Sequence, residues 1–317
     1  MRINTKKLLI GLIFNLFFFF NWSITAIDLK KYNAKDNPDI FLWCHKQCKK
    51  EEKQLIQDIL EKAGLKNSKW KALKKDIKKS YQEAISGKKH DSKCKKTFSK
   101  KSIAAIKAVL NNKKIAQLLE IKNITYLAGK IVVERKKHPS FTIISVHEHF
   151  DCDAATDECN LFINETSINE SHATQAEIEA TLAHEMIHIV YKDAFTVFCL
   201  ETVIDDMPKN CQNKIKKPFC RLMHLQEQRA DILSALTNKK YIRASRNFFK
   251  RQIQEEPQQH VSDTHPTNKQ RVYDMQLLEK VINEPPKKTN TRFYVLLLLL
   301  CFKLLFLCFS QIKDFSK

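Results

Sequence analysis

The chain has 317 residues, of which 43% are hydrophobic and 28% are charged, so it can bury one substantial core and is too apolar for a disordered chain. Four glycines are present, too few for a collagen-like sequence or a glycine-rich dinucleotide loop. The net charge of +20 comes mainly from residues 27–140, which hold 30 Lys and Arg against 12 Asp and Glu. Residues 141–292 hold 19 against 22, so the basic charge belongs to the first half.

Residues 1–26 have the order of a secretory signal peptide. Basic residues come first, an apolar run follows at 8–20, and small residues stand at 23–26. The prediction is a signal peptide that is removed, and the alternative is an uncleaved N-terminal anchor. In both cases we expect the body of the protein to be exported and membrane-associated, in the periplasm or another extracytoplasmic space.

Residues 27–120 are expected to form a basic helical segment. Apolar residues recur at helical spacing in 47–63, 69–86 and 102–121, and lysines occupy the opposite faces. These lysines form a solvated face or, alternatively, residues 27–140 contact anionic lipid or another polyanion. We expect no nucleic-acid partner, because few aromatic residues are interleaved with the lysines.

Between residues 121 and 169 the pattern changes from helix to strand. Segments 126–134, 141–147 and 160–164 are the candidate strands, the first two being rich in Ile, Val and Thr. We expect a small antiparallel sheet ahead of a helix. The sheet and the helices after it would form an α+β, mostly α-helical domain over residues 121–283.

Eight of the ten cysteines lie between the two apolar ends of the chain. An even number of cysteines in an exported chain predicts disulfides. Cys152 with Cys159 and Cys211 with Cys220 close short loops and are the preferred pairs. The alternative is a cysteine-rich structural zinc site, although the sequence has no Cys-x-x-Cys pair.

A capping box that begins at Thr174 predicts the start of a helix with an apolar seam. This helix carries His184 and His188 four residues apart, so both imidazoles project from one face and can reach one metal ion. Glu185 lies one step round the helix, where it can take a proton from water beside the metal. The pattern therefore predicts a His-Glu-x-x-His zinc site.

A second helical stretch supplies the missing ligand. A catalytic zinc needs three protein ligands and one open position for water. With the two histidines already placed, Glu227 is the expected third ligand, and Asp231, one turn later, is expected to orient a ligand histidine. His224, three residues before Glu227, is the alternative ligand. We therefore expect one Zn²⁺ per chain.

The third segment begins with His265-Pro266, and Pro266 starts a helix that carries Arg271 inward. The three segments in this order resemble the zinc metallopeptidase family of the CAAX prenyl proteases, HtpX, BepA and the mitochondrial Oma-type proteases. That family has His-Glu-x-x-His, then Glu-x-x-Ala-Asp, then a His-Pro pair followed by an arginine. The resemblance covers roughly residues 121–278.

The resemblance implies a zincin-like metallopeptidase domain with its zinc site on the helix that carries the His-Glu-x-x-His motif. It implies that His265 and Arg271 bind the substrate carbonyl or the oxyanion, with gating of the zinc as the alternative role for His265. It also implies an edge strand within residues 141–150 that pairs with the substrate backbone. The chain lacks the multiple membrane spans of some relatives, so the soluble exported BepA-like branch is favoured. It departs from the family in lacking the usual Pro-Gly-Gly turn, where Cys152–Cys159 stands instead.

The C-terminal part has a predicted linker at 284–292, an apolar run at 293–309 and a polar tail at 310–317. At 1.5 Å per residue the run spans roughly 25 Å, slightly less than a bilayer core of ~30 Å. Lys303 lies near its middle, which disfavours insertion. We expect a transmembrane helix here or, alternatively, an amphipathic helix that lies on the membrane.

These motifs together predict a zinc-dependent endopeptidase that hydrolyses exported or membrane-associated proteins, in quality control or processing. Its substrates would be proteins or peptides. Glu185 would move the protons, and His265 with Arg271 would stabilise the oxyanion. The alternative is a non-catalytic envelope binding factor, in which the zinc fold is a scaffold and the basic half binds anionic surfaces. An intact Glu185 disfavours this alternative, because a scaffold needs no general base.

Overall fold

The computed structural model describes part of the chain, namely residues 27–33, 37, 39–87, 97–146, 154–157, 159–170, 172–257 and 264–284. The signal peptide predicted for 1–26 lies outside these residues, and so do the linker, membrane helix and tail predicted for 284–317, except for Glu284. Among the described residues, no helix has both the length and the apolar character that crossing a bilayer requires.

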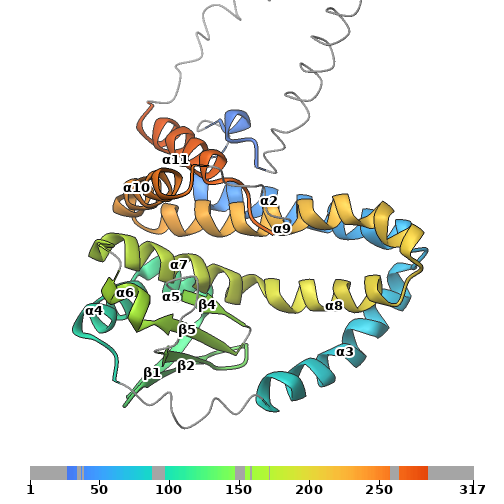
Figure 1. The fold of residues 1–317 in the computed structure, drawn as a ribbon, viewed down its shortest axis with the longest axis horizontal. Coiled ribbons are helices and arrows are strands. Elements are labelled where there is room, and N and C mark those ends of the chain that lie inside the picture. Colours follow the sequence, from blue (N-terminus) through green and yellow to red (C-terminus); the bar gives the residue numbers. More distant parts are fainter. Residues whose placement is uncertain are drawn as a thin grey trace, which may run out of the picture.

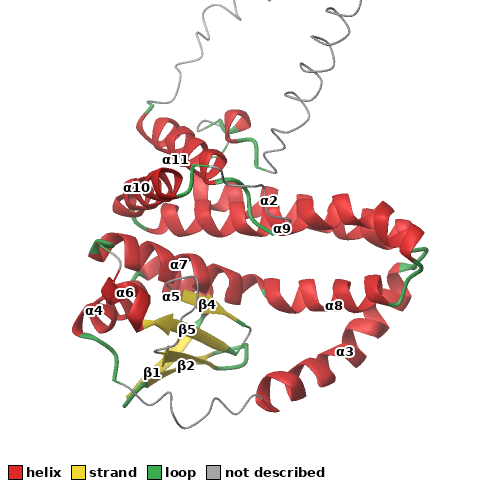
Figure 2. Cartoon of the chain, viewed as in Figure 1, coloured by secondary structure: helices red, strands yellow, loops and turns green. Residues whose placement is uncertain are grey.

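The described chain is mostly helical with one small sheet, as expected for an α+β protein rich in helix (Figure 2). The first half contains the 3-10 helix η1 (Leu29–Lys31) and the helices α2 (Ile40–Lys62), α3 (Asn67–Gly87), α4 (Lys100–Leu110) and α5 (Lys113–Leu119). The strands are β1 (Ile121–Leu127), β2 (Lys130–Arg135), β3 (Phe141–Val146), β4 (Ala154–Thr156) and β5 (Asn160–Asn164). The remaining helices are α6 (Glu165–Glu170), α7 (Gln175–Tyr191), α8 (Asp193–Asp205), α9 (Lys209–Thr237), α10 (Lys239–Glu255) and α11 (Asn268–Asn283).

The sheet has the strand order β1-β2-β3-β5-β4 and is mixed, so the antiparallel expectation is wrong. β3 and β5 run parallel, whereas the other neighbouring pairs are antiparallel. Parallel neighbours need a crossover, and here the crossover contains the short strand β4, which pairs with the outer side of β5. The expectation that residues 141–150 contain an edge strand is also wrong for the described part, β3. This strand lies between β2 and β5, and the edges of the described sheet are β1 and β4.

Two predicted elements are divided in the structure. The helix predicted over 102–121 breaks after α4, because the Asn112 side chain accepts hydrogen bonds from the backbone N–H groups of Lys114 and Ile115 and so starts α5. The strand predicted over 126–134 is a hairpin between β1 and β2, with Gly129 at a φ of 70° in the turn. Both breaks depend on a single residue inside an otherwise continuous apolar pattern.

The helix α9 is the centre of the packing (Figure 1). It contacts α2 along one side and α7 on another, while α10 and α11 pack on each other and on α9. The sheet lies against α7 through β4. Buried side chains from both halves of the chain form one hydrophobic cluster, with members such as Leu55, Ile59, Ile106, Ile143, Leu182 and Ile232. The helices that carry the predicted site residues are therefore fixed by a shared core.

The disulfide predicted between Cys211 and Cys220 is wrong. Both residues lie on α9, and nine residues of helix separate them by roughly 13.5 Å along the axis. A disulfide bridges Cα atoms that are less than about 7 Å apart, and Cys211 has a free thiol in the structure. Cys152 lies outside the described residues, so its pairing with Cys159 stays a prediction.

Candidate metal centre

The helix α7 begins where the capping box predicts it. The Thr174 side chain accepts from the backbone N–H of Glu177, and the Glu177 carboxylate accepts from the backbone N–H of Thr174. This start fixes the helical phase, so His184 and His188 leave the helix on one face, one turn apart. The side chains of these histidines are 12% and 11% exposed, which leaves them open on one side only.

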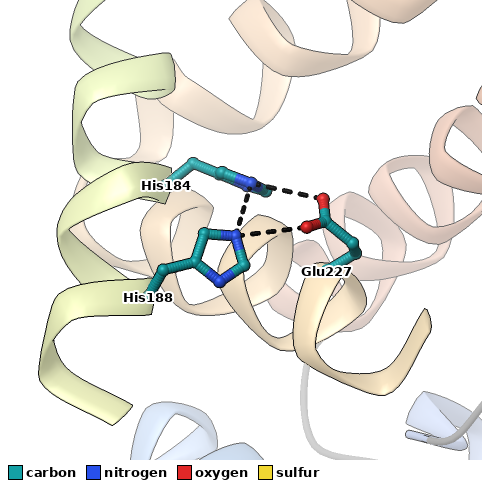
Figure 3. A group of neighbouring side chains, drawn as sticks. All are labelled: His184, His188 and Glu227. Atoms are coloured by element: carbon teal, nitrogen blue, oxygen red, sulfur yellow. Dashed lines mark hydrogen bonds and ion pairs between the residues drawn. The ribbon is translucent and has the colours of Figure 1, made fainter. Parts of the chain in front are cut away.

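The side chain of Glu227 reaches these histidines from α9 (Figure 3). The Nε2 atoms of His184 and His188 lie 3.0 Å apart. The Glu227 carboxylate oxygens lie 3.4 Å from Nε2 of His184 and 3.3 Å from Nε2 of His188. One nitrogen of each ring and one carboxylate therefore converge on a common point, as the sequence predicts.

These three residues fit a zinc ion. Tetrahedral zinc at ~2.0 Å from nitrogen and oxygen holds its ligand atoms about 3.3 Å from one another. The two Nε2 atoms lie 3.0 Å apart, and each has a different oxygen of Glu227 at 3.3 to 3.4 Å, so every one of these distances is close to this spacing. Two histidines and one glutamate are also a common ligand set of catalytic zinc, in which the fourth position stays open.

The first histidine is held by what we call the His184 arm, consisting of His184, Asp231 and Arg271. The Nδ1 atom of His184 lies 2.9 Å from the Asp231 carboxylate. Arg271 on α11 donates from Nε and Nη2 to the two oxygens of Asp231, each over 2.7 Å. Because Asp231 accepts at Nδ1, the His184 ring is held with the lone pair of Nε2 directed at the centre.

The second histidine is held by the His188 arm, consisting of His188, Asp193, Arg229 and Glu52. The Nδ1 atom of His188 lies 2.7 Å from Asp193, the first residue of α8. The Arg229 guanidinium donates to Asp193 and, over 2.8 Å, to Glu52 on α2. Arg229 is fully buried, and its guanidinium stacks 3.9 Å from the centre of the Tyr191 ring. This arm therefore reaches from the centre to the first half of the chain.

The charges at the centre suit a cation. Burial lowers the pKa of His184, but hydrogen bonds to Asp231 and Glu227 outweigh burial and raise this pKa to about 9. The pKa of His188 also lies well above its usual value, because the charge of Glu227 and the bond to Asp193 outweigh burial. Burial raises the pKa of Glu227, yet the two histidines hold it well below its usual range. The carboxylates therefore favour positive charge here, whether as protons or as a metal ion.

Glu185 lines the cavity next to the converging ligands. Burial raises the pKa of its carboxyl, while the charges of His184 and His188 oppose the change. A carboxylate with a raised pKa binds a proton more strongly than an exposed carboxylate does. It is therefore a better general base near neutral pH. This position and this pKa direction are those of a general base.

The centre opens into a cavity of about 920 Å³. Its wall includes an ion pair between Glu177 on α7 and Arg251 on α10, whose atoms lie 3.0 Å apart. It also includes the apolar side chains of Val197 on α8 and Met223 on α9, and Thr156 of the edge strand β4. The volume lies in the upper part of the range found for ligand sites, and the wall offers both charged and apolar contacts.

The other predicted residues take different positions. His265 stands at the cavity with its side chain 55% exposed, and its Nε2 atom is 3.6 Å from the Glu227 carboxylate. Arg271 also lines the cavity, but two of its nitrogens bind Asp231 and the third, Nη1, takes no part in that pair. His224 does not belong to the converging group, so Glu227 is the better candidate ligand among the described residues.

Sequence reasoning missed the outer part of the His188 arm. Only Lys192, which turns the chain with a φ of 60°, separates Asp193 from the end of α7. An acid in the first turn of the apolar helix α8 was a signal that could have been noticed. Arg229 is a lone cation among buried residues of α9, which is a second such signal. Glu52 resembles the other charged residues of α2, so its role could not be recognised.

No family model, no curated protein and no solved structure matches this chain. The resemblance to the zinc metallopeptidases therefore stays a prediction from the three sequence motifs. His184, His188 and Glu227 converge, Asp231 and Arg271 support them, and Glu185 and His265 face the same cavity.

Proposed function

We propose that the protein is a zinc-dependent endopeptidase that resembles the soluble exported BepA-like branch of the zinc metallopeptidase family. The observation that carries this proposal is the convergence of His184, His188 and Glu227, with Glu185 beside them at the wall of a large cavity. A zinc ion bound by these ligands would supply a Lewis acid that polarises the scissile carbonyl and activates water. Each ligand histidine already has a carboxylate partner at Nδ1, as ligand histidines of zinc enzymes usually do.

In this proposal, different residues around the centre transfer the proton and stabilise the negative charge. Glu185 accepts the proton of the attacking water and returns it to the leaving amine. The exposed imidazole of His265 stands at the cavity, where it can donate to the oxygen that becomes negative. Arg271 acts mainly through Asp231, because two of its nitrogens are used in that pair. The Nη2 atom of Arg271 also lies 3.8 Å from the Glu227 carboxylate, so its positive charge is close to the site where an oxyanion would form.

The position of β4 supports a peptide as the substrate. Among the residues that the structure describes, this strand pairs with β5 alone and forms an edge of the sheet, and it also lines the cavity. An extended peptide can add to such an edge through main-chain hydrogen bonds, which places its backbone along the cavity. The predicted signal peptide makes exported or membrane-associated proteins the substrate class.

The test measures metal content and cleavage together. The purified protein should contain one zinc ion per chain and should cleave a quenched-fluorescent casein. Glu185→Gln should keep the zinc and lower kcat by about 100-fold to 10,000-fold, since it removes the general base alone. Glu201→Gln makes the same change on an exposed position of α8 and should leave both values unchanged.

Two results would reject this function. A folded protein without zinc affinity would exclude the metal centre. Zinc binding together with cleavage that Glu185→Gln leaves unchanged would assign the activity to a contaminant. Zinc binding without any cleavage, combined with vesicle binding that falls steeply with salt, would favour the scaffold that binds anionic surfaces through residues 27–140.

A further inference from the structure

The first described residue of the chain is buried. Ile27 is 2% exposed and belongs to the hydrophobic core. Its backbone nitrogen donates to Oε1 of Gln228 over 3.0 Å, although the two residues are 201 positions apart. The neighbouring helix η1 packs against α11, which keeps this start of the folded chain next to α9 and α11. The backbone nitrogen of Ile27 therefore has a defined partner inside the protein.

That partner leads to a buried carboxyl group. The Nε2 atom of Gln228 donates to Oδ2 of Asp274 over 3.0 Å, and Gln270 donates to Oδ1 over 2.8 Å. Asp274 is 4% exposed, and both of these donors are neutral amides. A buried carboxylate is costly without a cation close by. Burial raises the pKa of Asp274 to about 7, which reflects the same cost.

Ile27 is also the residue that follows the predicted signal peptide. Hydrolysis of the Ala26–Ile27 peptide bond adds one water molecule and yields a carboxylate on Ala26 and an α-amino group on Ile27. With a pKa of about 7.7–8.0, an α-amino group is mostly protonated at neutral pH. The bond to Gln228 would then be made by an ammonium group in place of an amide N–H.

We propose that Gln228 and Asp274 form a binding site for the α-ammonium group of Ile27, created when a signal peptidase removes residues 1–26. The ammonium donates to Gln228 and places a positive charge at the opposite end of the Gln228 amide from Asp274, in addition to the charge of Arg271, which already favours this carboxylate. The site lies directly behind the candidate metal centre, because Gln228 follows Glu227 on α9 and Asp274 is one turn beyond Arg271 on α11. This proposal goes beyond the proposed peptidase activity, and its test uses neither substrate nor metal.

The experiment uses the full-length gene, expressed with export, and the protein purified in detergent. Intact mass should show a chain that begins at Ile27. An acylating reagent at pH 7 should modify the α-amino group at least about tenfold more slowly in the folded protein than in denaturant, because a buried ion-paired ammonium is a poor nucleophile. The matched control carries two residues, Ala-Ser, inserted between Ala26 and Ile27. After processing, its α-amino group lies outside the site and should react freely.

Asp274→Asn completes the test in both backgrounds. In the processed native chain this change should lower the melting temperature by roughly 5 °C, because it removes the partner of the ammonium. In the chain with the insertion it should cause little loss, because no ammonium is present in the site. Three results would overturn the proposal, namely a mature chain that begins elsewhere, equal labelling of folded and unfolded protein, or the same loss for Asp274→Asn in both backgrounds.

Discussion

The His184 arm and the His188 arm have the same order of groups, imidazole to carboxylate to guanidinium, but draw them from different parts of the chain. Asp231 and Arg271 of the first arm come from α9 and α11, at the wall of the cavity. The second arm passes through Asp193 to Arg229, which has no exposed surface, and ends at Glu52 on α2. Both carboxylates line the cavity, so the arms differ at the guanidinium, where Arg271 lines the cavity and is 13% exposed, whereas Arg229 is fully buried.

This difference shows that the basic first half contributes a residue to the interactions that hold His188 of the candidate metal centre. Arg229 carries a positive charge in the interior and needs more than one acid around it. Asp193 supplies one and Glu52 the other. The helix α2 therefore supports the metal ligand His188 through two intermediates, in addition to its apolar packing on α9.

The largest effect on metal binding is expected at the inner ends of the arms. His184→Ala and His188→Ala each remove one of three ligands, so both variants should lose stoichiometric zinc. Metal analysis after dialysis against a weak chelator measures this loss. If either variant kept one zinc ion per chain with unchanged affinity, that histidine and its arm would not belong to a metal site.

A tenfold to 100-fold loss of zinc affinity is expected from Asp231→Asn and from Asp193→Asn, because each leaves a ligand histidine without its orienting carboxylate. The two variants should differ in stability. Asp193→Asn weakens the buried pair with Arg229 and should cost about 3–5 kcal/mol of unfolding free energy. Asp231→Asn should cost less, since Arg271 is 13% exposed and stands 3.8 Å from Glu227. Equal costs in urea titrations would contradict the difference between the arms.

Glu52→Gln tests the outer end of the His188 arm. It removes a charge-assisted bond to Arg229, so we expect a loss of about 1–3 kcal/mol in unfolding free energy. The zinc affinity should fall less than tenfold, because Asp193 still holds His188. Glu51→Gln changes the preceding residue of α2 and serves as the control. If Glu52→Gln lost as much zinc affinity as Asp193→Asn, the expectation that Asp193 alone is enough to hold His188 would be wrong.

The smallest effect on metal binding is expected from Asp274, which lies behind the His184 arm. Its pKa rises from an ordinary 3.8 to about 7, through burial first and the Asp231 charge in addition, against the bonds from Gln270 and Gln228 and the charge of Arg271. Because the folded state then holds a proton that the unfolded state releases, the unfolding free energy should fall between pH 4 and 7. Asp274→Asn should flatten that slope. The slope should be steeper when the insertion before Ile27 keeps its α-ammonium out of the site.

The parts of the site that could be predicted are those that depend on the spacing of residues within one helix. The capping box at Thr174 and the four-residue step from His184 to His188 depend on one helix, so neighbouring residues suffice to read them. Glu227 and Asp231 are likewise one turn apart on a helix. The acid at Asp193 and the cation at Arg229 gain their meaning only after α7, α8 and α9 have packed together. No pattern within one segment specifies such a contact.

The errors in the fold have the same origin. The strand β4 has three residues, too few for an alternating pattern, and it forms one edge of the sheet. The sheet is mixed because β3 and β5, which the sequence predicts as antiparallel strands, run parallel. The pair Cys211 and Cys220 was interpreted as closing a loop, but α9 continues through Pro218 and holds them apart. Whether a short strand forms, and whether a helix continues past a proline, depends on tertiary contacts that a single segment of sequence does not show.

The bond between Arg229 and Glu52 joins residues 177 positions apart, which bears on the order in which the protein folds. Closing a loop of that length lowers the conformational entropy of the chain before any stabilising contact has formed. Non-local pairs of this kind therefore form late in folding. The helix with both histidines can form early from local contacts alone. The His188 arm closes only after α2 has met α9, so the two histidines can be in place on α7 before the interaction that supports His188 from α2 has formed.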